Sequence, residues 1–205
     1  MPKPMEREDW NRRYAAQDFI WTVEPNRFLV AGVADLPAGR ALELASGEGR
    51  NAVWLAEQGW TVRAVDFSDV AAEKGRRLAA ARNVADRVDF QVADLRDHTP
   101  EVQRFDLVAL TYLQIPLADL APILARAAQA VAPGGTFLLA AHDPANLEHG
   151  HGGPRDPGVL YTAEQVVAAL GGELVIEEAG RAERPVTTGD GVRIAIDCVV
   201  RGKRP

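Results

Sequence analysis

The chain has 205 residues, of which 47% are hydrophobic and 25% are charged, and its formal net charge is −6. That length suits one domain with a sizeable core, and the composition is that of an ordinary soluble globular protein. The acidic balance disfavours two classes of function, the coating of nucleic acid and the binding of membranes through a polybasic surface.

No segment approaches the roughly 18 consecutive apolar residues of a membrane span, and the first residues lack the apolar region of a secretory signal. The single cysteine, Cys198, lies inside the apolar run "IAIDCVV", so the chain cannot form an internal disulfide. These features predict a cytoplasmic protein.

Two amphipathic segments come first, and we expect them to cap the ligand-binding edge of a sheet. From about residue 40, apolar runs then alternate with amphipathic helices, with Gly59 as a helix stop and Ser68 as an N-cap. The predicted segments are the caps 6–17 and 25–34, the strands 40–45, 61–67, 87–95, 105–113 and 136–142, and the helices 50–58, 68–82 and 117–132. This alternation predicts a parallel, doubly wound sheet.

The C-terminal part does not continue the alternation of strands and helices. A long loop rich in Gly, Pro and His follows residue 142, and a short helix is predicted near 163–170. The runs "ELVIEEAGRAE" and "VRIAIDCVVRG" come last. A loop of about ten residues between them is too short for a helical crossover, so they are predicted to pair antiparallel at the edge of the sheet.

The expected fold is therefore α/β and Rossmann-like. It is a mostly parallel, seven-stranded, doubly wound sheet with a C-terminal antiparallel hairpin and an N-terminal helical cap. We expect one domain in three parts, a cap at 1–37, a cofactor-binding core at 38–142, and a substrate-side loop with the hairpin at 143–205.

The stretch "GEGRNA" begins at Gly47 and fits the dinucleotide fingerprint G-x-G-x-x-G/A, with the acidic Asp66 at the end of the next strand. A turn without a ligand is the simpler alternative. Charge favours one ligand class, because Glu43 and Glu48 would repel a diphosphate at a helix N-terminus. They would suit the ammonium and sulfonium of S-adenosylmethionine.

Five ordered motifs resemble those of the class I S-adenosylmethionine-dependent methyltransferases. They are "LELASGEG", "VDFS", "VADL", "FDLVALTYL" and "APGG", and together they span nearly all of residues 38–142. Ala45 departs from the glycine that many members have there. The resemblance implies that Asp66 contacts the ribose hydroxyls and that Asp94 meets the adenine amino group beside Leu95.

The resemblance implies S-adenosyl-L-methionine as cofactor and S-adenosyl-L-homocysteine as product. The upstream "WNRRY" also resembles the small-molecule branch related to tellurite-resistance and thiopurine or thiol methyltransferases, in which an N-terminal aromatic segment closes over the cofactor. The expected cofactor-binding residues are Glu43, Ala45, Ser46, Gly47, Gly49, Asn51, Asp66, Phe67, Ser68, Asp94, Leu95, Thr111, Tyr14 and Trp21. The expected substrate contacts are Trp10, Tyr112 and His142.

Methyl transfer requires chiefly that two reactants be aligned. A general base is needed only if the acceptor must lose a proton, as a phenol or an amine does and a thiolate does not. His142 is the first candidate for that base and Tyr112 the second. Since His149 and His151 lie in a Gly/Pro loop without rigid spacing, no metal site is expected.

The expected partner is a small-molecule methyl acceptor, without nucleic acid or membrane, and the protein is expected to be a monomer or a homodimer. Two rival functions remain open. One is a nicotinamide-dependent NAD(P) oxidoreductase, which would need a turn that accepts anions and offers no use for Asp94. The other is a non-catalytic protein that binds S-adenosylmethionine.

Overall fold

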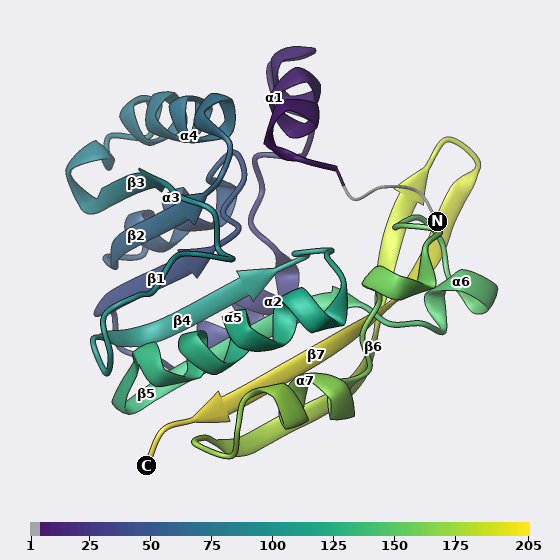
Figure 1. Ribbon diagram of the computed structural model, residues 1–205. Helices are drawn as coiled ribbons and strands as arrows, with labels where there is room; N and C mark the ends of the chain where they lie inside the picture. The colour runs from purple at the N-terminus through teal and green to yellow at the C-terminus, as the bar shows by residue number, and fades with distance from the viewer. Residues whose placement is uncertain (1–4) are drawn as a thin grey trace.

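The computed structural model describes residues 5–205, and at its centre is one seven-stranded sheet in the order β3-β2-β1-β4-β5-β7-β6 (Figure 1). The first five strands are parallel, β7 pairs antiparallel with β5, and β6 pairs antiparallel with β7. The strands are β1 (Arg40–Leu44), β2 (Thr61–Asp66), β3 (Val88–Val92), β4 (Phe105–Thr111), β5 (Val131–His142), β6 (Val175–Thr188) and β7 (Gly191–Lys203). The predicted fold class is confirmed.

Helices cover both faces of the sheet because the central strands are apolar on both sides. The helices are α1 (Arg7–Ala15), α2 (Arg27–Val33), α3 (Arg50–Glu57), α4 (Asp69–Ala81), α5 (Leu117–Ala130), α6 (Asn146–His149) and α7 (Ala163–Ala169), with 3-10 turns η1 (Ala85–Arg87) and η2 (Pro157–Val159). In β4, Val108 and Leu110 pack in one core with α5 and α7, whereas Leu107 and Ala109 pack in a second core with α2, α3 and α4.

Side-chain caps define where several helices begin. Ser68 is the N-cap of α4, as predicted, and its Oγ accepts a hydrogen bond from the Ala71 amide at 3.0 Å. Asn26 caps α2 through two amides, and Thr162 forms a capping box with Gln165 at the start of α7. These caps satisfy amide groups that have no partner inside the helix.

The terminal hairpin is longer than predicted. The expected connection of about ten residues is wrong, because the ladder between β6 and β7 continues to the pair Thr188 and Gly191. Val186, Thr187 and Thr188 are β-branched and extend the strand, which leaves only two residues in the turn. The fifth strand also begins earlier than the predicted residue 136, since the motif "APGG" lies within β5.

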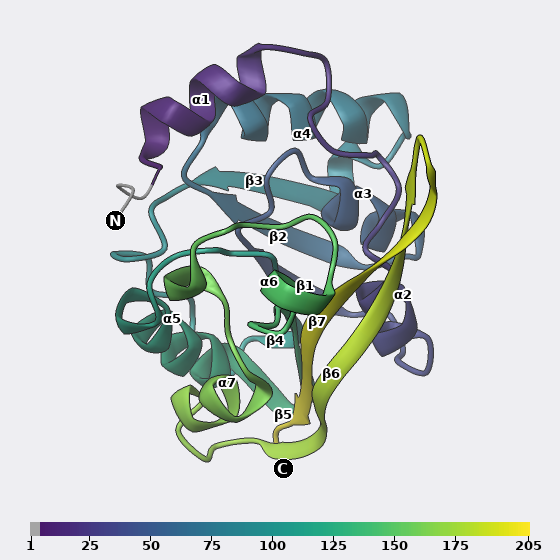
Figure 2. The same cartoon turned by 90° about the vertical axis from the view of Figure 1, so that its right-hand side faces the viewer.

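The carboxyl ends of β1, β2, β4 and β5 meet at one edge of the sheet. Figure 2 views this edge, with α1 above it, α6 in front of it and the outer end of the β6–β7 hairpin beside it. Ligands of open α/β sheets bind at this edge. Within residues 5–205, no helix combines the length and apolar character needed to cross a bilayer.

Candidate functional site

The turn after β1 is built from three residues with positive φ, namely Ala45 (56°), Gly47 (53°) and Gly49 (79°). A Cβ on Gly49 would lie 2.7 Å from the Phe90 ring, so glycine is required there by packing as well as by conformation. Ala45 occupies a left-handed conformation at some cost in strain, which is a physical reason for a glycine at this position.

Asp66 holds the turn in shape. Its Oδ2 accepts a hydrogen bond from the Gly47 amide at 2.8 Å, and its Oδ1 accepts one from the Ser68 amide at 2.9 Å. The carboxyl is buried, and burial raises its pKa above the ordinary value while these amides lower it. The predicted ribose contact therefore falls on a residue that already organises the turn and the start of α4.

Glu43 lies at the centre of a buried polar network rather than at an open mouth. Its Oε1 accepts a hydrogen bond from Asn51 Nδ2 at 2.8 Å, and the same Nδ2 donates to Thr111 Oγ1 at 3.1 Å. Glu43 Oε2 and the Ser46 hydroxyl are buried without a partner in residues 5–205. Burial raises the pKa of Glu43 to about 7.

Glu48 is not available to attract a cationic ligand, in contrast to the expectation from its place in the turn. Its Oε1 lies 3.0 Å from Lys74 Nζ, and both side chains are buried. Its carboxylate also accepts hydrogen bonds from the amides of Ile20 and Trp21. Lys74 neutralises Glu48. Of the two carboxylates expected to favour a cationic ligand at the turn, only Glu43 is therefore left.

The N-terminal segment is fastened over the turn through Lys74. Its Nζ donates to the carbonyl of Tyr14 and, at 2.6 Å, to that of Gln17. Tyr14 is buried and its ring centroid lies 5.5 Å from that of Trp10, whereas Trp21 is 45% exposed. The predicted aromatic cap thus includes one residue fixed against the turn and one that remains accessible.

Asp94 is already paired in this structure. Its Oδ2 lies 2.6 Å from Arg96 Nη2, and this guanidinium lowers the pKa of the carboxyl. The neighbouring Leu95 is buried. The predicted contact with adenine would have to be shared with Arg96.

A second polar cluster centres on Asp197 of β7, which is fully buried. One of its carboxylate oxygens, Oδ2, accepts hydrogen bonds from the Tyr112 hydroxyl at 3.0 Å and from Arg184 Nε at 2.7 Å. The other, Oδ1, lies 2.9 Å from His142 Nδ1. The rings of Tyr112 and His142 are 4.9 Å apart between centroids. We name Tyr112, His142, Arg184 and Asp197 the Asp197 cluster.

The other edge of His142 faces the loop after β5. A Cβ on Gly153 would lie 2.9 Å from His142 Nε2, so only glycine leaves room beside this nitrogen. Asn146 anchors the loop, because its Nδ2 donates to the Gly152 carbonyl and its Oδ1 accepts from the Ile196 amide. The loop is therefore organised around His142.

The cluster brings together the two candidate bases, His142 and Tyr112, with two residues that sequence analysis missed. Asp197 could have been noticed as a charged residue inside the apolar run "IAIDCVV". Arg184 carries no such signal because it lies in the segment predicted to be a loop. His149 and His151 do not join His142, and within residues 5–205 no group of three metal-ligating side chains occurs.

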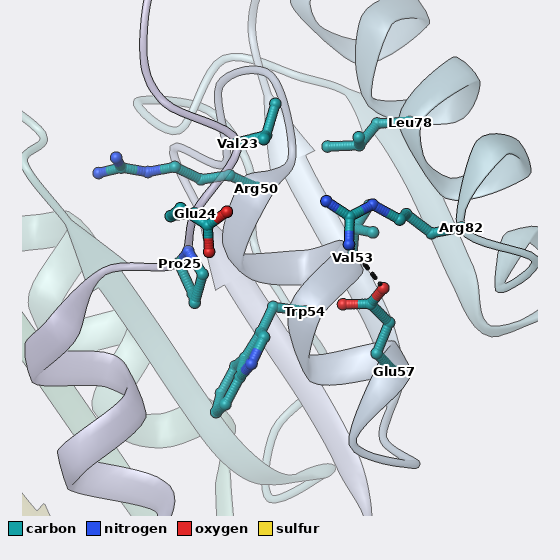
Figure 3. A pocket seen from close by; sticks show the side chains of 9 residues that line it. All are labelled: Val23, Glu24, Pro25, Arg50, Val53, Trp54, Glu57, Leu78 and Arg82. Atoms are coloured by element: carbon teal, nitrogen blue, oxygen red, sulfur yellow. Dashed lines mark hydrogen bonds and ion pairs between the residues drawn. The ribbon is translucent and has the colours of Figure 1, made fainter.

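A small pocket of about 100 Å³ lies apart from this cluster, between α3, α4 and the segment around Pro25 (Figure 3). The Arg82 guanidinium and the Glu57 carboxylate pair on one side of it, 3.3 Å apart. Arg50 also lines the pocket, but its guanidinium points away from that pair. The pocket is lined by Val23, Glu24, Pro25, Arg50, Val53, Trp54, Glu57, Leu78 and Arg82.

The chain is similar to known methyltransferases. Residues 41–135 match the model of the family described as a methyltransferase domain. The demethylmenaquinone methyltransferase of Clavibacter sepedonicus is 32% identical over 122 residues, which is 60% of this chain and 47% of that protein. The chain spans about half the length of the curated relatives it matches.

Two solved structures share the fold over nearly the whole chain. One comes from work on the conversion of a disulfide bond into a thioacetal group during echinomycin biosynthesis, with a TM-score of 0.77, 21% identity, and coverage of 97% of this chain and 91% of that chain. The other is the N-methyltransferase NodS from Bradyrhizobium japonicum WM9 in complex with S-adenosyl-L-homocysteine. Its TM-score is 0.72, its identity is 16%, and the coverage is 97% of this chain and 98% of that chain.

Proposed function

We propose that this chain transfers a methyl group from S-adenosylmethionine to a small-molecule acceptor, because residues 41–135 match the methyltransferase-domain family and the chain shares the fold of an N-methyltransferase solved with S-adenosyl-L-homocysteine. The names of the curated relatives support a small acceptor, because they are a demethylmenaquinone methyltransferase, a C-methyltransferase of ubiquinone and menaquinone biosynthesis, and a tocopherol O-methyltransferase. The relation to the tellurite-resistance and thiopurine branch stays a prediction, as do the cytoplasmic location and the division of the chain into three parts.

One observation carries this proposal, the direct connection between the glycine turn and the Asp197 cluster. Asn51 at the start of α3 bridges Glu43 of β1 and Thr111 of β4, and Thr111 is followed by Tyr112. β1, β4 and β5 are neighbours in the sheet. A cofactor held at the turn would therefore have its reactive end beside a buried group of polar side chains, as group transfer requires.

The residues present at the turn fit the cofactor. Glu43 Oε2 and the Ser46 hydroxyl are buried and lack a partner in residues 5–205, so both keep hydrogen-bonding capacity for a polar ligand. We assign the methionyl ammonium to Glu43, the ribose hydroxyls to Asp66 and the adenine to the Asp94–Leu95 corner. Tyr14 and Trp21 of the N-terminal segment, which lies over the turn, would exclude water from the bound cofactor.

When bound, S-adenosylmethionine supplies a methyl group on a sulfonium that is already a good leaving group. The residues of the Asp197 cluster would then prepare the acceptor. His142 is oriented by the Asp197 carboxylate at Nδ1, which leaves Nε2 to take a proton from the nucleophile. Burial raises the pKa of Tyr112 to about 12, so its hydroxyl suits a hydrogen-bond role better than that of a base.

If His142 accepts a proton, one class of nucleophile is favoured. Thiolates and inorganic anions need no base, whereas phenols and amines lose a proton as they are methylated. We therefore propose an oxygen or nitrogen nucleophile. A non-catalytic binder of S-adenosylmethionine has no use for an oriented histidine. A nicotinamide-dependent oxidoreductase would need a turn that accepts a diphosphate, and the buried Glu43 disfavours that ligand.

The test of cofactor binding uses Asp66→Asn and Asp66→Ala, with Asp106→Ala as the matched control. Asp106 lies on the same sheet, but it binds the Arg40 amide at the opposite end of the strands. We expect S-adenosylhomocysteine binding, measured by calorimetry, to weaken at least tenfold in folded Asp66 variants and to stay within twofold of wild type in Asp106→Ala. Normal binding by folded Asp66→Ala would refute the assigned ribose site.

A further inference from the structure

The side chain of Asn51 joins three parts of the molecule that meet at the glycine turn. We propose that Asn51 is a positioning residue, which holds Glu43 so that one carboxylate oxygen is free for the ammonium group of the cofactor. This role is indirect, whereas the resemblance predicts a direct contact between Asn51 and the cofactor. The inference rests on the proposed function, because it concerns how that cofactor is held.

The hydrogen-bonding groups of Asn51 are already engaged. Its Nδ2 donates to Glu43 Oε1 at 2.8 Å and to Thr111 Oγ1 at 3.1 Å, and its Oδ1 accepts from the backbone amide of Asn26 at 2.7 Å. A primary amide has two N–H donors, so both are used. The residue is only 2% exposed. A ligand at the turn therefore meets the partners of Asn51 rather than Asn51 itself.

The partners also fix which way the amide of Asn51 points. The backbone N–H of Asn26 can only donate, so it must face the oxygen of the side chain and not the nitrogen. The nitrogen is then directed at Glu43 and Thr111. Asn51 is the second residue of α3, and the glycine turn leads directly into that helix. The turn and the helix thus bring a hydrogen-bond donor to the carboxyl end of β1.

The two carboxylate oxygens of Glu43 consequently have different roles. Oε1 is bound by Asn51, whereas Oε2 is buried and has no partner within residues 5–205. A carboxylate held through one oxygen presents the other in a fixed direction. Supporting hydrogen bonds of this kind orient a ligand-binding group before the ligand arrives, which lowers the entropy lost on binding.

Asn51 also favours the charged form of Glu43, which an ammonium group requires. Burial raises the pKa of Glu43 to about 7, and the hydrogen bond from Asn51 is the strongest influence that opposes this rise. Arg50 and the Ala52 amide lower the pKa further, whereas the charge of Asp66 on β2 raises it. Without the donor, burial would keep Glu43 protonated to a higher pH.

A purely structural role is the alternative, because Asn51 also ties the start of α2 to β4 through Asn26 and Thr111. The two roles differ in their pH dependence. Loss of a structural tie weakens cofactor binding by the same factor at every pH. Loss of the support for Glu43 weakens it most at the lower pH, where more of the Glu43 carboxyl becomes protonated.

The test is calorimetric titration with S-adenosylhomocysteine at about pH 6 and about pH 8.5, on wild type and Asn51→Leu. We expect the variant to bind more weakly, and the ratio of wild-type to variant affinity to be at least threefold larger at the lower pH. Asn51→Ala, which adds no bulk, is expected to show the same change of ratio and serves if Asn51→Leu does not fold.

Asn146→Leu is the matched control, because Asn146 is also 2% exposed and bonds backbone groups away from Glu43. Its affinity ratio to wild type is expected to be the same at both pH values. Asn51→Leu is also combined with Glu43→Gln, which removes the titrating carboxyl. We expect the ratio between Glu43→Gln and this double variant to be independent of pH.

Two results would overturn the positioning role of Asn51. One is a ratio of wild type to Asn51→Leu that is equal at both pH values, and the other is a pH-dependent ratio that persists with Glu43→Gln. Failure of the proposed function looks different, because S-adenosylhomocysteine would then not bind to wild-type protein at either pH.

Discussion

Asp197 lies against three side chains of the cluster. Tyr112 and Arg184 bind one oxygen, and His142 Nδ1 faces the other. The pKa of Asp197 is held below its ordinary value by His142 and Arg184 in spite of burial. The carboxylate therefore remains ionised and keeps the imidazole oriented with Nε2 toward the loop at Gly153.

Gly153→Ala tests whether the space beside His142 Nε2 is used. A Cβ at Gly153 would meet the imidazole at 2.9 Å, whereas one at Gly152 would meet nothing within 4 Å. Both glycines have positive φ, of 74° and 75°, so Gly152→Ala carries the same backbone strain and is the matched control. We expect Gly153→Ala to lower methyl transfer to a phenol or amine acceptor at least tenfold relative to Gly152→Ala, with unchanged S-adenosylhomocysteine affinity. Equal rates in the two variants would contradict a role for Nε2.

Glu43 makes the stability of the protein depend on pH. Its pKa is raised from 4.5 to about 7 in the folded state, so the folded protein binds the proton more tightly than the unfolded chain. The stability that this proton supplies is present below the ordinary pKa and is lost as pH rises through 7. The magnitude is on the order of 3 kcal/mol.

Glu43→Gln is therefore expected to flatten the decline of the unfolding free energy between about pH 5 and pH 8, and to stabilise the protein at the upper end. Denaturant unfolding at several pH values measures this, with the exposed Glu73→Gln as control. A decline as steep in Glu43→Gln as in wild type would show that other groups cause it. S-adenosylhomocysteine, with its ammonium, is expected to bind Glu43→Gln more weakly than wild type.

Among the secondary-structure elements, helix α1 and the segment after it are held by a buried ion pair between α4 and the glycine turn. Lys74 of α4 and Glu48 of the turn lie 3.0 Å apart, and together they bind two carbonyls and two amides of residues 14–21. Asp69 adds surface contacts to Arg7 and Asn11. The N-terminal segment is thus connected to the same turn that is proposed to hold the cofactor.

Lys74→Met is expected to destabilise the protein by about 3–5 kcal/mol, because it leaves the Glu48 carboxylate buried without its partner. The double variant Lys74→Met/Glu48→Gln removes both charges and is expected to recover a large part of that loss. Chemical denaturation of the four proteins in a double-mutant cycle gives the coupling energy. Additive losses in the double variant would mean that the pair does not act as a unit.

Most helices and strands could be predicted from the sequence, and the exceptions have physical causes. The parallel strands and the Ser68 cap follow from apolar runs and short-range hydrogen bonds, which local sequence specifies. The extent of the β6–β7 hairpin could not be predicted from local sequence, since Arg184, Pro185 and Gly189 resemble loop residues. Their strand conformation depends on pairing across the hairpin, which is set by the whole ladder.

At the scale of the whole molecule, the fold and the turn motif could be predicted, but the pairing of charges could not. Glu48 looks free in the sequence, and only the approach of α4 shows that Lys74 neutralises it. Asp197 and His142 are 55 positions apart and meet because β5 and β7 pair in register at His142 and Asp197. Such contacts arise from topology, which a single sequence specifies only weakly.

The proposed cofactor site is tested by calorimetric titration of this chain with S-adenosylhomocysteine, with NADH titrated in parallel. We predict saturable one-site binding of S-adenosylhomocysteine and no binding of NADH, because Glu43 favours a ligand with an ammonium group over a diphosphate. Binding of NADH without S-adenosylhomocysteine would contradict the methyltransferase function and the assignment of every cofactor contact at the glycine turn.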